Sequence, residues 1–269
     1  MNIAEYHKMH AMEQRYWWFQ GRRATILGVL EEALGQYLPG VERPVLLDAG
    51  CGTGMLLDDL GRHGVATGVD FSPVALQYCR ARGLTRLVRA DAQRLPVPDA
   101  SADVLVSLDV VEHVPDDVRL MGEFFRALRP GGIALMTVPA HPRLWSAHDV
   151  ALHHHRRYTH AGFRALVEGA GFETVRYTHT VASVFWPAAA YRRLKSTIFR
   201  RPGPPRTDEF PLPNWINSAL LRVMLAEARW VRRRDLPFGL SLLCVARKPV
   251  PEPEPAGDAA AQTADQPSG

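Results

Sequence analysis

The chain has 269 residues, enough for one full core, and its 46% hydrophobic and 22% charged residues are ordinary for a soluble globular protein. Its three cysteines, Cys51, Cys79 and Cys244, lie far apart, which excludes a disulfide framework or a zinc spacing and favours a reducing cytoplasm. The N-terminus has no apolar core of a signal peptide, and the longest nearly uncharged apolar run, 181–191, is too short to span a bilayer.

The net charge of +4 is unevenly placed. The tail from Pro249 contains four acidic residues and no Lys or Arg, and we expect it to be disordered. The segment 192–234 contains eleven Lys or Arg against three acidic residues, so it accounts for the whole positive surplus of the rest of the chain.

Residues 1–38 are predicted to be helical. Four consecutive aromatic residues, 16–19, precede the basic pair Arg22 and Arg23. They fit either a helix packed on the following domain or a lid whose aromatic side chains cover a ligand. In a lid, Arg22 would bind a carboxylate of the ligand, because a guanidinium can donate two hydrogen bonds to it.

Residues 45–54 predict a strand, a glycine loop and the start of a helix. The first three are apolar, as in a short buried strand, and the apolar spacing becomes helical from Met55. Between them, Gly50, Gly52 and Gly54 leave the backbone bare, so that a ligand can lie against it. This order is typical of the nucleotide-binding start of a doubly wound α/β fold.

The glycine spacing and one carboxylate indicate the kind of nucleotide. A dinucleotide site has Gly-x-Gly-x-x-Gly and would need its third glycine at Met55, whereas this loop reads Gly-x-Gly-x-Gly around Cys51. Asp48 closes the strand beside the loop. Its carboxylate would repel a pyrophosphate and attract a cationic sulfonium or ammonium group.

The second predicted strand, 65–70, ends at Asp70, twenty residues after Gly50. A nucleotide-binding α/β fold places there the carboxylate that binds the ribose hydroxyls. After Phe71, Ser72 suits the N-cap of the next helix.

Three more strands and a helix are predicted up to residue 138, namely strands at 87–89, 104–108 and 133–138 and an amphipathic helix at 119–128. Asp91 and Ala92 follow the first of these strands, Leu108 ends the second, and His113 comes soon after it. Ligands of open α/β sheets bind at these carboxyl ends of strands.

Four motifs in this order over residues 45–139 resemble those of the class I S-adenosylmethionine (SAM) methyltransferases: the glycine loop, residues 68–72, residues 90–92 and the Leu-x-Pro-Gly-Gly turn at 128–132. The chain is most similar to the ubiquinone/menaquinone C-methyltransferase-like branch, which is broad in substrate. The resemblance implies a Rossmann-like seven-stranded sheet with helices on both faces, whose strands six and seven pair in antiparallel fashion.

The resemblance also implies SAM as cofactor, with its methionine part at Asp48 and the glycine loop, its ribose at Asp70 and its adenine at Asp91 and Ala92. The expected cofactor-binding residues are Arg22, Asp48, Gly50, Cys51, Gly52, Asp70, Phe71, Asp91, Ala92 and Leu108. The Asp/Asn-Pro-Pro-Tyr/Phe motif of adenine-N6 and glutamine amide methyltransferases is absent, which argues against these two activities.

The loop 139–160 follows the fifth strand and should overhang the site. It is rich in histidine, and residues 154–158 form a His-x-Arg-Arg-Tyr motif that resembles a bacterial subgroup of SAM methyltransferases. Three interpretations compete: a metal site, a structural loop with solvated histidines, and a substrate-binding loop. Consecutive histidines on one element converge poorly, so we expect no metal. In a substrate-binding loop, His154 or Asp149 would take a proton from the nucleophile, and one of the two arginines would hold an anionic group.

His113 is a further candidate for a general base, because it should lie near the methyl group and imidazole titrates near neutral pH. The alternative is a histidine that caps a helix or packs in the core.

Strands six and seven are expected at 173–178 and 240–246. Between them, the segment 180–239 predicts apolar, aromatic helices bordered by arginine. They suit an element that contacts an anionic membrane or a lipid substrate, a helical cap over the sheet, or a dimer contact. Nucleic acid is disfavoured, because no RNA-binding module accompanies the basic helices.

The predicted organisation is therefore a helical lid at 1–38, a SAM-binding methyltransferase domain at 39–248 and a tail at 249–269. The predicted function is methyl transfer to an oxygen or carbon of a small or lipid-like acceptor, in the cytoplasm or at the inner face of the membrane. Two alternatives stay open: a methyltransferase of a soluble secondary metabolite, with the insertion as a lid, and a non-catalytic SAM-binding partner or regulatory protein.

Overall fold

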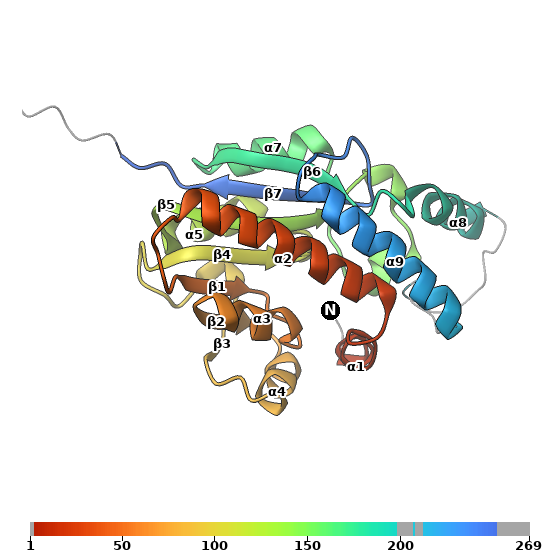
Figure 1. The fold of residues 1–269 in the computed structure, drawn as a ribbon, viewed down its shortest axis with the longest axis horizontal. Coiled ribbons are helices and arrows are strands. Elements are labelled where there is room, and N and C mark those ends of the chain that lie inside the picture. Colours follow the sequence, from red (N-terminus) through yellow and green to blue (C-terminus); the bar gives the residue numbers. More distant parts are fainter. Residues whose placement is uncertain (1–2, 198–206, 208–211, 252–269) are drawn as a thin grey trace, which may run out of the picture.

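The computed structural model describes residues 3–197, 207 and 212–251, without the side chains of 192–197. Its centre is a seven-stranded sheet in the order β3-β2-β1-β4-β5-β7-β6, in which β7 runs antiparallel to both of its neighbours (Figure 1). The strands are β1 (Val45–Ala49), β2 (Val65–Asp70), β3 (Leu87–Arg89), β4 (Ala102–Leu108), β5 (Leu128–Pro139), β6 (Glu173–Thr180) and β7 (Ser241–Arg247). The predicted fold class, including the antiparallel pairing of the last two strands, is confirmed.

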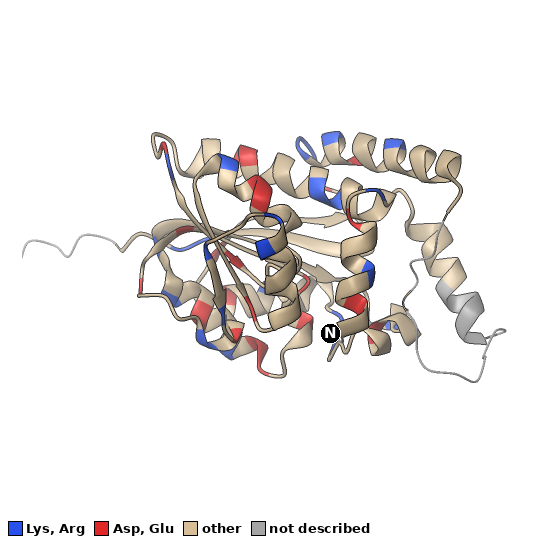
Figure 2. Ribbon diagram, turned by 90° about the horizontal axis from the view of Figure 1, so that it is seen from below, with Lys and Arg blue, Asp and Glu red and all other residues tan. Residues whose placement is uncertain are grey.

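Helices cover both faces of the sheet, and Figure 2 shows them above and below it. The α-helices are α1 (Ile3–Met12), α2 (Trp17–Tyr37), α3 (Met55–His63), α4 (Pro73–Ala81), α5 (Asp117–Ala127), α6 (Ala147–Ala151), α7 (His160–Gly169), α8 (Phe185–Thr197) and α9 (Asn214–Val231). Three short 3-10 helices complete the described elements: η1 (Ala92–Arg94), η2 (Val111–His113) and η3 (Pro142–Leu144).

The sheet separates two hydrophobic cores because neighbouring strand residues point to opposite faces. Leu46 packs with α2, α3 and α9, whereas Leu47 packs with α5 and α7. In β4, Val104 belongs to the same core as Leu46, and Leu105 belongs to the same core as Leu47. The fully apolar centre of β4 is therefore that of a strand buried on both faces.

The insertion between β6 and β7 provides α9, which lies beside α2 over one face of the sheet (Figure 1). The two helices approach so closely that a Cβ on Gly21 would lie 2.5 Å from the Cβ of Met224. Glu227 of α9 accepts hydrogen bonds from the backbone N–H groups of Ala182 and Ser183 at 3.1 and 2.7 Å, which ties the helix to the end of β6. This part of the insertion is a helical cover of the sheet. Several of its basic residues, 200, 201 and 206, lie outside the described residues, as does most of the predicted tail.

Several predicted boundaries were wrong, among them the following three. The helix expected over 1–38 is two helices, which separate at residues 13–16. The strand expected to start at Ile133 starts at Leu128, where Gly131 adopts a φ of +82° at an irregularity in the pairing with β4. The strand expected to end at Thr178 continues to Thr180. Helices of the described ranges are all too short or too polar to cross a membrane.

Candidate functional site

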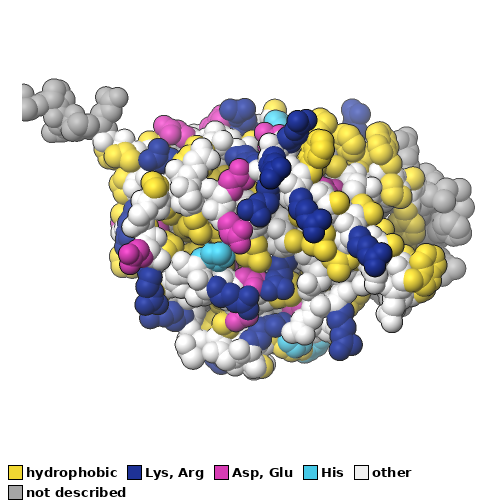
Figure 3. All heavy atoms as spheres, in the orientation of Figure 1, with side chains coloured by type: hydrophobic (Ala, Val, Ile, Leu, Met, Phe, Trp, Pro, Cys, Tyr) yellow, Lys and Arg dark blue, Asp and Glu magenta, His cyan; other side chains and the backbone are white. Residues whose placement is uncertain are grey.

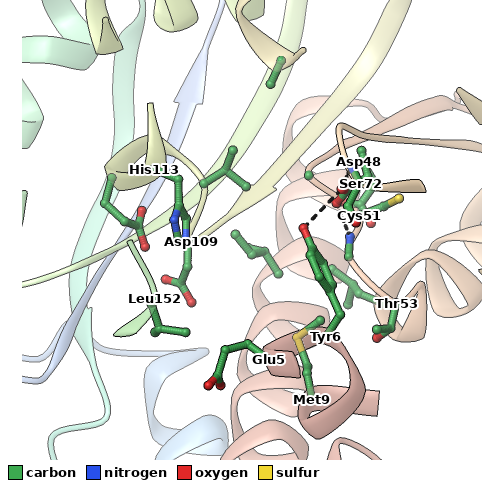
Figure 4. A pocket seen from close by; sticks show the side chains of 18 of the residues that line it. Glu5, Tyr6, Met9, Asp48, Cys51, Thr53, Ser72, Asp109, His113 and Leu152 are labelled. Atoms are coloured by element: carbon green, nitrogen blue, oxygen red, sulfur yellow. Dashed lines mark hydrogen bonds between the residues drawn. The ribbon is translucent and has the colours of Figure 1, made fainter. Parts of the chain in front are cut away.

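A cavity of about 720 Å³ lies at the carboxyl ends of the parallel strands β1, β2, β4 and β5 (Figure 4). All ten residues expected to bind a cofactor line it, together with His113 and His154. Helix α1 and the start of α2 cover it from the N-terminal side.

The glycine loop between β1 and α3 exposes its backbone to this cavity. Gly50, Gly52 and Gly54 all have positive φ angles, of 91°, 54° and 82°, which favour glycine. A Cβ on Gly50 would lie 2.3 Å from a methyl carbon of Val110. The loop therefore requires glycine for its own conformation, and Gly50 and Gly52 line the cavity.

Two carboxylates lie beside this loop. Asp70 accepts the N–H of Gly52 at 2.9 Å and that of Ser72 at 2.8 Å, and burial raises its pKa. Asp48 is only 3% exposed, and no described residue donates a hydrogen bond to it. Burial and the neighbouring charge of Asp70 raise the pKa of Asp48 to about 7.

The remaining predicted cofactor residues lie at the rim. Asp91 accepts the N–H of Gln93 at 2.9 Å and so caps η1, which begins at Ala92. Phe71 is 70% exposed beside the cavity, and Leu108 ends β4 at its floor.

Helix α1 supplies contacts that the sequence did not predict. The hydroxyl of Tyr6, which is labelled in Figure 4, donates to Asp70 at 3.4 Å. Just after the helix, the buried Glu13 forms an ion pair with Arg82 and accepts a hydrogen bond from the hydroxyl of Thr53. These contacts hold α1 against the glycine loop. No motif marks them, because α1 buries no residue and its partners are far away in sequence.

Arg22 lines the cavity, as expected, but its guanidinium already has protein partners. It forms an ion pair with Asp109 and donates to the hydroxyl of Thr137 at 3.1 Å. Burial alone would raise the pKa of Asp109, but the charge and hydrogen bond of Arg22 outweigh it and lower that pKa.

His113 and His154 come from different segments and meet edge to face, with ring centroids 4.7 Å apart. Burial, and next the charge of His154, lower the pKa of His113 to about 3, so His113 is neutral near pH 7. Glu112 lies beside them with no exposed surface, and burial raises its pKa well above the usual value. Glu112 was not among the site residues predicted from the sequence, although it directly precedes His113.

Asp149 does not line the cavity. It is fully buried, pairs with Arg157 at 2.6 Å, contacts Nδ1 of His154 at 3.1 Å and accepts the N–H of Ser146 at 2.8 Å. Burial alone would raise its pKa, but His154 and Arg157 lower it. Asp149 therefore organises the loop 139–160 from inside, whereas His153 and His155 are exposed.

Comparisons with known proteins agree with this arrangement. Residues 47–136 match the family model described as "Methyltransferase domain". A "Probable S-adenosylmethionine-dependent methyltransferase" of Mycolicibacterium smegmatis is 37% identical over 134 residues, which are 48% of this chain and 51% of the relative. A "Ubiquinone biosynthesis O-methyltransferase" of Alkalilimnicola ehrlichii is 29% identical over 147 residues, 51% of this chain and 60% of the relative.

Residues 47–136 are therefore similar to a methyltransferase domain. The chain spans about half the length of the curated relatives it matches. Solved structures are similar to this chain over a larger share of its length than the curated relatives are. A chain from the complex between the Haloferax volcanii Trm112 methyltransferase activator and a methyltransferase has a TM-score of 0.58 and 24% identity, covering 93% of this chain and 96% of that one. The [4+2]-cyclase SpnF has a TM-score of 0.53 and 22% identity, covering 83% and 81%. These likenesses show the fold.

The buried position of Asp149 predicts a structural role. Asp149→Asn removes the carboxylate charge that pairs with the buried Arg157, so we expect a loss of about 3–5 kcal/mol in the free energy of unfolding, measured by urea denaturation. The matched control is Asp58→Asn, because Asp58 forms an exposed pair with Arg62 at 3.5 Å. That change should cost less than about 1 kcal/mol. Equal losses for the two variants would contradict the structural role of Asp149.

Proposed function

We propose that the protein is a SAM-dependent methyltransferase that acts on an oxygen or carbon nucleophile of a small or lipid-like acceptor. The observation that carries this proposal is the single cavity wall formed by the glycine loop, Asp48, Asp70 and Asp91, each at the end of a strand or beside it. The matched methyltransferase domain contains all of these residues.

In this proposal, the wall binds the three parts of SAM in turn. Each oxygen of Asp70 accepts one backbone N–H and keeps a further lone pair for a ribose hydroxyl. The Tyr6 hydroxyl, which donates to Asp70, stands where a ribose hydroxyl would donate. Asp48, with no hydrogen-bond donor among the described residues, faces the cationic methionine part. Asp91 and the N–H of Ala92 face the adenine edge.

SAM supplies the electrophilic methyl group, and the protein aligns the acceptor with it in a covered cavity. His113 and His154 line the far end of this cavity. His113 is the candidate for taking the proton that a hydroxyl or carbon acid loses when it is methylated, but its pKa of about 3 makes the metal-free imidazole a weak base. Asp149 positions His154 through Nδ1 and takes no part at the reacting atoms.

The ribose assignment predicts a loss of SAM affinity. Asp70→Ala removes two charge-assisted hydrogen bonds to the ribose, so we expect SAM to bind about 100-fold more weakly in a calorimetric titration. Asp58→Asn, at an exposed position of α3, serves as the control and should bind SAM as the unchanged protein does. Undiminished affinity in a folded Asp70→Ala protein would exclude this role of Asp70.

The raised pKa of Asp48 predicts that SAM affinity depends on pH. Because a cation binds to the ionised carboxylate, affinity should rise from pH 6 to pH 7.5 and fall about tenfold per unit well below pH 7. Asp48→Asn should remove this dependence. S-adenosylhomocysteine lacks the sulfonium charge and therefore distinguishes two possible contacts of Asp48. If only the affinity for SAM depends on pH, Asp48 contacts the sulfonium. If the affinity for both ligands depends on pH, Asp48 contacts the ammonium group. A flat profile for SAM would contradict the assignment.

The acceptor class is tested by tritiated methyl transfer to extracts of the host. Exposed tryptophans on α8 and α9, Trp186, Trp215 and Trp230, support a lipid-like acceptor and contact with an anionic membrane. Figure 3 shows one face of the molecule on which basic side chains lie among hydrophobic ones. Label in the organic phase is then expected. Label only in the aqueous phase would instead support a soluble acceptor, with the insertion as a lid. The cytoplasmic location stays a prediction.

The same assay addresses the non-catalytic alternative. A fold shared with the [4+2]-cyclase SpnF does not by itself specify methyl transfer. SAM binding without transfer to any extract would support a SAM-binding regulatory protein.

A further inference from the structure

We propose that Glu112, His113 and His154 bind a divalent transition-metal ion at the acceptor end of the cavity, with a coordination position open to an acceptor oxygen. The sequence analysis argued against a metal because consecutive histidines on one element converge poorly. In the structure, only one histidine of the run 153–155 belongs to the cluster, and the other ligands come from η2.

The three side chains are close enough to share one ion. One nitrogen of each imidazole and one carboxylate oxygen lie within 4.8 Å of one another, and all three residues line the cavity. Atoms bound to one zinc ion at about 2.0–2.2 Å lie roughly 3.3 Å apart. Small side-chain movements are therefore enough to bring them around an ion. His113 and the neighbouring Asp109 project into the cavity in Figure 4.

Glu112 provides an independent sign of a missing cation. Its side chain has 0% exposure, and neither of its carboxylate oxygens accepts a hydrogen bond from another residue in the described part of the chain. Nδ1 of His113 is likewise buried without a partner there. Acceptors buried in this way are costly, and a shared metal ion would satisfy them together.

His154 is oriented as a metal ligand is. Asp149 accepts hydrogen bonds from Arg157 and Ser146, and it lies 3.1 Å from Nδ1 of His154. Nδ1 therefore donates to Asp149, and in the neutral imidazole the lone pair is then on Nε2, 3.9 Å from an oxygen of Glu112. Two acceptors then face each other across a space that suits a cation. A carboxylate behind a ligating histidine is the usual second layer of a metal site.

The donor set indicates the class of ion. Two imidazoles and one carboxylate suit zinc and the neighbouring divalent transition metals, whereas calcium and magnesium prefer oxygen ligands alone. Three protein ligands leave a position for an oxygen from water or from the acceptor. Binding of an acceptor oxygen to the ion rests on the proposed function, whereas binding of the ion to the three side chains does not. A bound ion would lower the pKa of an acceptor hydroxyl and hold its oxygen toward the methyl group.

The test is a titration of the metal-free 269-residue chain with Co²⁺, monitored by visible absorption, and with Zn²⁺, monitored by calorimetry. We expect one equivalent to bind, and Glu112→Gln and His154→Asn to weaken binding at least about tenfold each. Glu112→Gln keeps the size and shape of the side chain, and it breaks no hydrogen bond because the carboxylate accepts none from another described residue. The matched control is His155→Asn, because His155 is an exposed neighbour of the cluster, and this change should leave metal affinity unaltered.

Each sample is also titrated with SAM, so that the two proposals fail separately. SAM binding without stoichiometric Co²⁺ binding would overturn the metal site and leave the proposed function intact. Co²⁺ binding that depends on Glu112, without any SAM binding, would support the metal site and overturn the proposed function. If Glu112→Gln and His155→Asn alter metal binding equally, the ion binds to surface histidines, and the proposed site is wrong.

Discussion

The site depends on the cost of burying carboxylates together at one edge of the sheet. Asp48, Asp70, Asp109 and Glu112 all line the same cavity, where each charge loses its hydration. Backbone N–H groups stabilise Asp70, and Arg22 stabilises Asp109. Asp48 and Glu112 have no such partner among the described residues. The two uncompensated acids mark where cationic ligands would be most stabilising: a cationic cofactor at one and a metal ion at the other.

The sequence predicted the cofactor wall well because its residues belong to local motifs. A strand, a glycine turn and a helix fix the position of Asp48, and the parallel neighbour β2 brings Asp70 to the same edge. A lid at 1–38 was expected, but the contacts that hold α1 over the site could not be predicted in this way. Tyr6 meets Asp70, and Glu13 meets Arg82, across long stretches of chain, and no periodic pattern distinguishes these side chains from ordinary polar surface.

The histidine-rich loop shows a different limit of sequence reasoning. Its composition indicates chemistry, but it does not say which of three consecutive imidazoles points inward. In the structure, Asp149 decides this, because it closes the start of α6 with Ser146 and also contacts His154. Asp149 can do so only because Arg157 returns to it after the loop folds back along β5. That pairing depends on tertiary structure, so a residue that suited a general base at the sequence level is instead buried behind the site.

The two roles considered for His113 and His154 exclude each other, and the choice bears on the chemistry of the acceptor. As free bases, the imidazoles would serve an oxygen or a carbon acid, because either needs only a proton acceptor. As metal ligands, their lone pairs are occupied, and the ion selects an acceptor through its oxygen. The buried Glu112 favours the second arrangement, because neither of its carboxylate oxygens has a hydrogen-bond partner in the described part of the chain and a metal ion would supply one. The metal site would therefore restrict the proposed reaction to acceptors that present oxygen.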